Sequence, residues 1–234
     1  MEQGASGLAD RHADELTVAL RIGHRGAAGY ERENTLRSFL RAIDLGVDYI
    51  ETDLRRTSDD VIVLNHDPWI KGKDDIRREV KSSSLAELRA EFEGIAALDD
   101  VLSIARGRTG LMLEIKVVGI SEKTIEQVDR SGFDGLVIYA SFHHPELLKI
   151  RELRPKSKTL ALLHGGLVNP IQFAKDARTT HAGLNVEFAT EERVTALQRA
   201  GLQVFVYTVN ELSDIEAMKS VGVDGIISDY PDRL

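Results

Sequence analysis

Eight short apolar runs, rich in Val and Ile and separated by segments of helical periodicity, limit the folds open to this chain. They occupy residues 21–24, 47–54, 111–116, 135–141, 159–164, 183–188, 203–210 and 225–229. Strands that are apolar almost throughout are typical of a buried parallel sheet with helices crossing over between its strands. The alternation therefore predicts an α/β fold with eight parallel strands.

Polar residues recur at the C-terminal end of nearly every predicted strand. This distribution favours a closed TIM-type (β/α)8 barrel, whose loops share one mouth, over an open doubly wound sheet, which gathers its ligands at one switch point. The sequence has no G-x-G-x-x-G or Walker loop. A length of 234 residues suits one barrel domain spanning residues 1–234.

Three features depart from a plain barrel. Residues 61–66 have the pattern of an extra extended segment after the second strand. Residues 67–100 are polar, and we predict that they form a small insertion over the barrel mouth, with helices near 85–92 and 98–105. The chain reaches Leu234 directly after the eighth strand, so no closing helix is expected there. Residues 8–20 are expected to cover that gap or to plug the barrel bottom, since their apolar side chains share one helical face.

Composition excludes several functional classes. The formal net charge of −8 argues against a nucleic-acid surface, and no apolar run approaches the roughly 20 residues that cross a membrane. The chain has no cysteine, which excludes disulfides, zinc thiolates and a cysteine nucleophile and agrees with a reducing compartment. The first twenty residues lack the apolar core of a signal peptide, so a cytoplasmic protein is expected. The sequence does not indicate an oligomeric state.

Three acidic residues form a candidate cation site. Glu51 and Asp53 are two positions apart on a predicted strand, so their side chains point to the same face. Glu114 ends the next strand of the barrel and is expected at the same pole. Carboxylates brought this close need a proton or a cation between them, and oxygen donors favour Mg²⁺ or Ca²⁺. A salt-bridged layer, with Arg25 or Lys116 as counter-charge, is the alternative.

Two histidines end predicted extended segments near these acids. His24 ends the first strand, and His66 ends the extra segment after the second. Imidazole titrates near neutral pH, and a positioned pair can act as general acid and base. Arg25 and Lys116 carry donors suited to phosphate oxygens. The combination indicates chemistry on an anionic substrate.

Three further residues at strand ends are candidate substrate contacts. His164 ends the fifth strand before two glycines, and Glu187 ends the sixth. Tyr207 ends the seventh strand, where it forms either an aromatic wall of the mouth or ordinary core packing with a hydrogen-bonded hydroxyl.

Seven short motifs occur in order between residues 22 and 231, each at or beside a predicted strand end. They are His24-Arg25-Gly26, Glu33-Asn34-Thr35, Ile50-Glu51-Thr52-Asp53, His66-Asp67, Glu114-Ile115-Lys116, Thr208-Val209-Asn210 and Ser228-Asp229-Tyr230-Pro231. Together they resemble the pattern of one known family, the glycerophosphodiester phosphodiesterases.

The resemblance implies a TIM-type barrel that hydrolyses glycerophosphodiesters to glycerol 3-phosphate and an alcohol, with one divalent cation, Mg²⁺ or Ca²⁺. The implied roles are cation binding for Glu51, Asp53 and Glu114, acid–base catalysis for His24 and His66, phosphate binding for Arg25 and Lys116, and formation of the mouth for Glu33. The small-molecule phosphodiester would be the only expected partner. Which histidine is the acid, and whether water or a glycerol hydroxyl is the nucleophile, both stay open.

Three single positions and one segment depart from the family pattern. Arg32 replaces a proline, Asp60 a turn glycine and Tyr207 a frequent tryptophan, and residues 69–74 replace a stretch rich in threonine and glycine. That stretch usually shapes the alcohol pocket, so the alcohol is left open. Cleavage of lysophospholipids on the phospholipase D pattern, a non-catalytic phosphate-binding barrel, and a purely structural protein are the alternatives.

Overall fold

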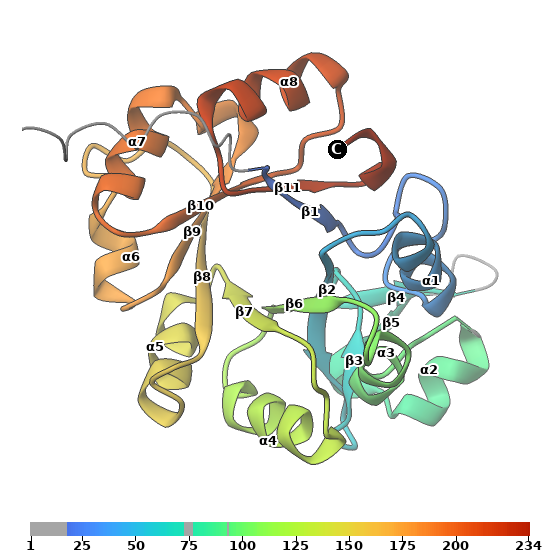
Figure 1. Cartoon of the computed structure of the whole chain (residues 1–234). Coiled ribbons are helices and arrows are strands. Elements are labelled where there is room, and N and C mark those ends of the chain that lie inside the picture. Colours follow the sequence, from blue (N-terminus) through green and yellow to red (C-terminus); the bar gives the residue numbers. More distant parts are fainter. Residues whose placement is uncertain (1–17, 73–76, 93) are drawn as a thin grey trace, which may run out of the picture.

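Eight parallel strands form a closed barrel in the computed structural model, which describes residues 18–72, 77–92 and 94–234 (Figure 1). The barrel strands are β1 (Leu20–Gly23), β2 (Tyr49–Arg56), β6 (Gly110–Ile115), β7 (Val137–Ser141), β8 (Lys158–Leu163), β9 (His181–Asn185), β10 (Gln203–Tyr207) and β11 (Gly225–Ser228). β1 pairs with β11 on one side and with β2 on the other, which closes the barrel. The predicted TIM-type barrel is confirmed.

Side chains of the barrel strands alternate between the barrel axis and the surrounding helices. Tyr49 belongs to a buried cluster built from strand residues alone, together with Met112 of β6 and Phe205 of β10. Ile50 and Leu54 pack instead in a cluster that includes residues of the helices. Because side chains alternate along a strand, Glu51 and Asp53 point the same way as Tyr49, toward the axis.

Helices follow the barrel strands and surround them (Figure 1). They are α1 (Leu36–Asp44), α3 (Leu98–Ala105), α4 (Ser121–Ser131), α5 (His144–Leu153), α6 (Gln172–Asp176), α7 (Glu191–Arg199) and α8 (Leu212–Val221). Their buried faces form two clusters, one under α1, α3, α4 and α5 and one under α6, α7 and α8. None of the helices in the described part of the chain is long and apolar enough to span a membrane.

The segment between β2 and α3 adds a small substructure beside the barrel. The extended segment expected at residues 61–66 contains strand β3 (Ile62–Leu64), which runs antiparallel to β2. It is followed by a hairpin of β4 (Trp69–Lys71) and β5 (Arg77–Glu79), the short 3₁₀ helix η2 (Val80–Ser82) and α2 (Leu85–Glu91). These elements share a core of Val63, Ile70, Val80, Leu88 and Ile95. Both helices expected in this segment are present, whereas the hairpin is not indicated by the sequence, because β5 is exposed throughout and has no apolar side chain.

The sixth strand ends earlier than its apolar pattern suggests. β9 stops at Asn185, and residues Val186–Phe188 form the 3₁₀ helix η3 instead of continuing the strand. The side-chain oxygen of Asn185 accepts a hydrogen bond of 3.0 Å from the backbone N–H of Glu187. This local bond turns the chain away from the sheet, because asparagine side chains compete for backbone donors.

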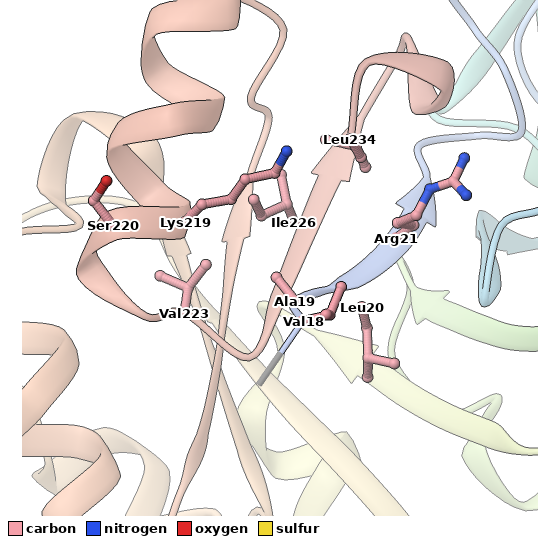
Figure 2. Close-up of a pocket in the computed structure, with 9 residues that line it drawn as sticks. All are labelled: Val18, Ala19, Leu20, Arg21, Lys219, Ser220, Val223, Ile226 and Leu234. Atoms are coloured by element: carbon pink, nitrogen blue, oxygen red, sulfur yellow. The ribbon is translucent and has the colours of Figure 1, made fainter. Parts of the chain in front are cut away.

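An apolar pocket of about 430 Å³ lies on the outer face of β1 and β11, beside the end of α8 (Figure 2). Its lining includes Val18, Val223, Ile226 and Leu234. After β11 the chain continues into the 3₁₀ helix η4 (Pro231–Arg233). The expectation of a covering segment at residues 8–20 falls largely on residues 1–17, which lie outside the described part of the chain; Leu20 begins β1.

Candidate active site

The three acids of the predicted cation site meet at the C-terminal mouth of the barrel. Glu51 and Asp53 lie on β2, and Glu114 lies on β6, where it is the register partner of Asp53. One carboxylate oxygen from each residue lies within 4.8 Å of the other two. Parallel pairing of β2 and β6 therefore brings together carboxylates that are 61 residues apart in the sequence (114 minus 53).

Each of these carboxylates keeps one buried oxygen without a hydrogen-bond partner: Oε1 of Glu51, Oδ1 of Asp53 and Oε1 of Glu114. Lys116 Nζ lies 2.7 Å from Glu114 Oε1 and 3.4 Å from Asp53 Oδ1, so the ammonium forms ion pairs with two of these oxygens, and Oε1 of Glu51 is left without a partner among the described residues. Buried polar atoms are seldom left unpartnered. Three carboxylates that each bring one oxygen within 4.8 Å of the others fit a hard divalent cation such as Mg²⁺ or Ca²⁺.

Burial and mutual repulsion shift the pKa values of the cluster in different directions. Burial, with repulsion from Asp53 and Glu114, raises the pKa of Glu51 well above its usual value. Burial and Asp53 also raise the pKa of Glu114 to about 7, although Lys116 acts in the opposite direction. Burial disfavours ionisation of Asp53 too, but attraction from Arg25 and Lys116 outweighs it and lowers the pKa. The cation-free cluster thus holds protons that a cation would displace.

The loop after β1 is attached to β2 through Arg25. Its backbone N–H donates a 2.8 Å hydrogen bond to Glu51 Oε2. Its guanidinium lies 3.2 Å from Asp53 Oδ2 through Nε and donates a 2.7 Å hydrogen bond from Nη1 to Glu33 Oε2. Glu33 thus orients Arg25 at the mouth, where the guanidinium can accept an anion beside the acids.

Asn34 belongs to one of the sequence motifs but was given no role there, and the structure places its side chain against Asp53. It is buried, and its Nδ2 donates a 2.8 Å hydrogen bond to Asp53 Oδ2. Its Oδ1 accepts from Thr52 Oγ1 at 2.7 Å and from the backbone N–H of Asp53 at 3.2 Å. Asn34 has a φ of 56°, a left-handed conformation that asparagine tolerates better than most residues. An asparagine in the loop after the first strand is therefore the sequence signal that could have identified this position.

His24 lies directly after β1, and Asp229 holds its ring on the side of Nδ1. Nδ1 is 2.6 Å from Asp229 Oδ1. The imidazole lines a small cavity of about 30 Å³ together with Glu51, Glu114 and Tyr207. With Nδ1 occupied, Nε2 is the ring nitrogen available to a substrate.

His66 follows β3 and is close enough to Asp53 to respond to its charge. Its Nδ1 lies 2.9 Å from Asp67 Oδ1, and its backbone oxygen accepts a 2.9 Å hydrogen bond from Arg55 Nε. Burial, with the positive charges of Arg25 and Lys116, lowers the pKa of His66, and Asp53 acts in the opposite direction. His66 is therefore mostly neutral at neutral pH.

An aromatic wall closes the cavity on the side of β7 and β10. The Tyr207 hydroxyl donates a 2.9 Å hydrogen bond to the backbone oxygen of Leu163, and burial raises the pKa of the phenol. Its ring meets Phe142 edge to face, with centroids 5.9 Å apart. Phe142 is a lining residue that sequence reasoning missed, although it directly follows a strand, as His24 does.

His164 and Glu187 are exposed side chains of the segments that follow β8 and β9. His164 is exposed and packs edge to face on Phe188, with centroids 5.9 Å apart. Glu187 is exposed in η3. Among the described residues, the lining of the small cavity includes neither side chain. Their predicted contacts with substrate stay predictions.

The chain is similar to known proteins in sequence and in fold. Residues 24–233 match the Glycerophosphoryl diester phosphodiesterase family. A glycerophosphodiester phosphodiesterase from Caldanaerobacter subterraneus subsp. tengcongensis is 32% identical over 233 residues, which span 91% of this chain and 95% of that protein. The crystal structure of a putative glycerophosphoryl diester phosphodiesterase from Silicibacter pomeroyi DSS-3 is 25% identical, with a TM-score of 0.85 over 93% of this chain and 92% of the other.

A phosphodiesterase from Oleispira antarctica, solved in complex with the product sn-glycerol-3-phosphate, shares the fold. It is 23% identical, with a TM-score of 0.81 over 91% of this chain and 93% of the other. The family match extends from His24, the first residue of the site, to the last turn of the chain. The chain belongs to the glycerophosphoryl diester phosphodiesterase family.

Proposed function

We propose that this chain hydrolyses glycerophosphodiesters to sn-glycerol 3-phosphate and an alcohol, with the aid of one divalent cation. The single observation that carries the proposal is the convergence of the three buried carboxylates of Glu51, Asp53 and Glu114, beside His24 and two cationic side chains. Membership of the family supports the reaction class.

Glu51, Asp53 and Glu114 would hold the cation, and their oxygen donors suit Mg²⁺ or Ca²⁺. When bound, such an ion neutralises negative charge that builds up on the phosphoryl group. Arg25 and Lys116 border the same carboxylates and present N–H donors to the non-bridging phosphate oxygens. The formal net charge of −8 makes this local positive charge necessary for binding an anion.

His24 and His66 are the proposed acid–base pair. One imidazole accepts a proton from the nucleophile, and the other donates a proton to the oxygen of the departing alcohol. An alkoxide is a poor leaving group, so loss of the donated proton should slow the reaction strongly. Water or the neighbouring glycerol hydroxyl can act as the nucleophile, and detection of a cyclic phosphate intermediate would distinguish the second route.

The test is an assay of the purified chain against glycerophosphocholine, glycerophosphoethanolamine and glycerophosphoglycerol, with Mg²⁺, Ca²⁺ or EDTA. We expect release of glycerol 3-phosphate that EDTA abolishes and one of the cations restores. His24→Ala and His66→Ala should each lower kcat by about 10²-fold or more without unfolding the protein. His143→Ala, at an exposed histidine outside the cavity lining, is the matched control.

Two results would contradict the proposal, the first in its reaction and the second in its acid–base pair. One is the absence of product from every substrate with every cation, which would favour a non-catalytic phosphate-binding barrel. The other is a near-normal rate for either histidine variant, which would remove that residue from the acid–base pair.

A second candidate function is cleavage of lysophospholipids, and one observation favours it. Val118, Phe142 and Val168 are exposed by 66%, 42% and 106% in the loops after β6, β7 and β8. These strands are neighbours, so the loops share one side of the mouth. An acyl chain would cover such apolar side chains.

Comparison of lysophosphatidylcholine with glycerophosphocholine as substrates separates the two functions. If the apolar side of the mouth binds an acyl chain, Val118→Ser and Val168→Ser should lower kcat/KM for the lysophospholipid only. Leu136→Ser is the matched control, since Leu136 is 59% exposed but precedes β7 and so lies at the opposite end of the barrel. Equal losses on both substrates would argue against an acyl-chain site.

A further inference from the structure

The carboxylate of Asp229 is held from both sides although it is absent from the proposed chemistry. Its Oδ1 lies 2.6 Å from His24 Nδ1, and its Oδ2 accepts a 2.6 Å hydrogen bond from Asn210 Nδ2. The side-chain oxygen of Asn210 accepts in turn from the backbone N–H of Asp229 at 2.9 Å and from Ser228 Oγ at 3.0 Å. These bonds fix which atom of the Asn210 amide is the donor and leave the Asp229 carboxylate one orientation.

The barrel itself positions this network. His24 follows β1, Asp229 follows β11 and Asn210 follows β10, and β11 pairs with both of the other strands. Backbone hydrogen bonds of 2.9 Å continue beyond the strands, from His24 N–H to the Ser228 oxygen and from Val209 N–H to the Ile227 oxygen. The three side chains are therefore placed by paired backbone and not by a free loop.

The second histidine has no comparable support. Asp67 is the next residue after His66, its side chain is 56% exposed, and the described residues provide its carboxylate with no second polar partner. The Asp229 side chain is 26% exposed. Burial disfavours its ionisation, but hydrogen bonds from His24 and Asn210 outweigh burial and lower the pKa of Asp229. Asp229 thus faces His24 as a carboxylate.

We propose that Asp229 is a positioning residue for His24, held in place by Asn210. By accepting the Nδ1–H, the carboxylate selects the tautomer whose Nε2 lone pair faces the cavity. It also stabilises the imidazolium that forms when Nε2 takes a proton, while Asp229 itself stays ionised. The proposal rests on the acid–base role proposed above for His24, and it predicts that the two histidines differ in how far they depend on a neighbouring carboxylate.

The decisive variant is Asp229→Asn, which keeps the shape but offers an N–H to Nδ1 and so favours the wrong tautomer. We expect kcat for glycerophosphodiesters to fall at least tenfold, with KM and cation affinity within about threefold of wild type. Asp229→Glu, which keeps the charge, should restore part of kcat. Asp232→Asn is the matched control, because Asp232 lies three residues further on and contacts Tyr30 at the surface.

A double-mutant comparison shows whether Asp229 acts through His24. In the His24→Ala background, Asp229→Asn should change the residual rate less than threefold, measured on bis(p-nitrophenyl) phosphate, whose good leaving group keeps slow variants measurable. An equal loss in both backgrounds would overturn the proposal, as would a kcat for Asp229→Asn within threefold of wild type. If Asp229→Asn does not fold, Asn210→Ser answers the same questions.

The tautomer of His24 gives an answer that does not depend on turnover. ¹⁵N NMR of labelled histidine should show Nδ1–H in the wild type and a shift toward Nε2–H in Asp229→Asn. An unchanged tautomer would contradict the proposal even if the variant were slow. An inactive wild type with the expected tautomers would count against the proposed function and leave the positioning role supported.

Discussion

At the scale of single residues, the precision of the site comes from two left-handed backbone positions in the loop after β1. Arg25 has a φ of 50° and Asn34 a φ of 56°. Such a conformation is uncommon for arginine, and the bonds from Arg25 to Glu51 and Glu33 compensate for it. The loop therefore delivers one backbone donor and two side chains to the acids of β2.

Asn34 should matter for cation binding although it is not a proposed ligand. Asn34→Ala removes the hydrogen bond to Asp53 and leaves the Thr52 hydroxyl without its acceptor. We expect the affinity for Mg²⁺ or Ca²⁺ to fall by about 10- to 100-fold, because partners of ligating carboxylates orient them. Calorimetric titration measures this, with Asn169→Ala, in the loop after β8, as the control. An unchanged affinity would show that Asp53 needs no support from Asn34.

The raised pKa of Glu114 gives cation binding a pH dependence. Since its pKa in the cation-free protein is about 7, a proton competes with the cation below that pH. Affinity should rise as pH increases through 7, by up to about tenfold per unit below it. Titrations at pH 6, 7 and 8, in buffers of different ionisation enthalpy, would also detect the released proton. Binding without proton release would contradict the raised pKa, and Glu114→Gln should weaken binding and flatten its pH dependence.

At the scale of elements, strongly periodic segments were predicted well and short polar ones were not. Residues 98–105 are predicted as a helix and form α3 with the same bounds, because four of its side chains are buried on one face. The hairpin of β4 and β5 escaped prediction, since its strands have three residues each and little alternation. Cross-strand pairing, which no local pattern contains, forms it.

Removal of a buried side chain from α3 should cost far more than removal of an exposed one. Leu102→Ala opens a cavity in a fully buried position, and we expect a loss of about 2–5 kcal/mol in the free energy of unfolding. Leu40→Ala on α1, where the side chain is 38% exposed, should cost less than about 1 kcal/mol. Urea denaturation followed by circular dichroism compares them. Equal costs would show that α3 is not a tightly packed part of the core.

At the scale of the whole molecule, a buried histidine outside the site should make stability depend on pH. His181, at the start of β9, is 2% exposed and packs on Phe205, with centroids 5.1 Å apart. Burial, assisted by the charge of Lys158, lowers its pKa from 6.5 to about 4. The unfolded chain therefore binds this proton more readily than the folded chain does.

The direction in which stability changes with pH follows from that difference in proton binding. The contribution of neutral His181 is complete above pH 6.5 and disappears as pH falls toward 4, a loss of about 3 kcal/mol at most. Denaturation at several pH values should show the free energy of unfolding decreasing between pH 6.5 and 4 in the wild type. The decrease should be smaller in His181→Gln. His143→Gln, at an exposed position, should keep the wild-type slope. The same slope in His181→Gln would assign the effect to other groups.

The eight apolar runs determined the barrel, because strands buried on both faces need apolar residues at nearly every position. The motif spacing likewise placed acidic, histidine and basic side chains at strand ends, where parallel strands bring them to one mouth of the barrel. Tertiary structure alone decided which of these residues meet. It brought Glu114 beside Asp53 through register, placed Asp229 against His24 across more than two hundred residues, and left His164 and Glu187 out of the lining of the small cavity. Side-chain direction at a strand end depends on where the following turn takes the chain, and that turn is set by pairing between distant segments.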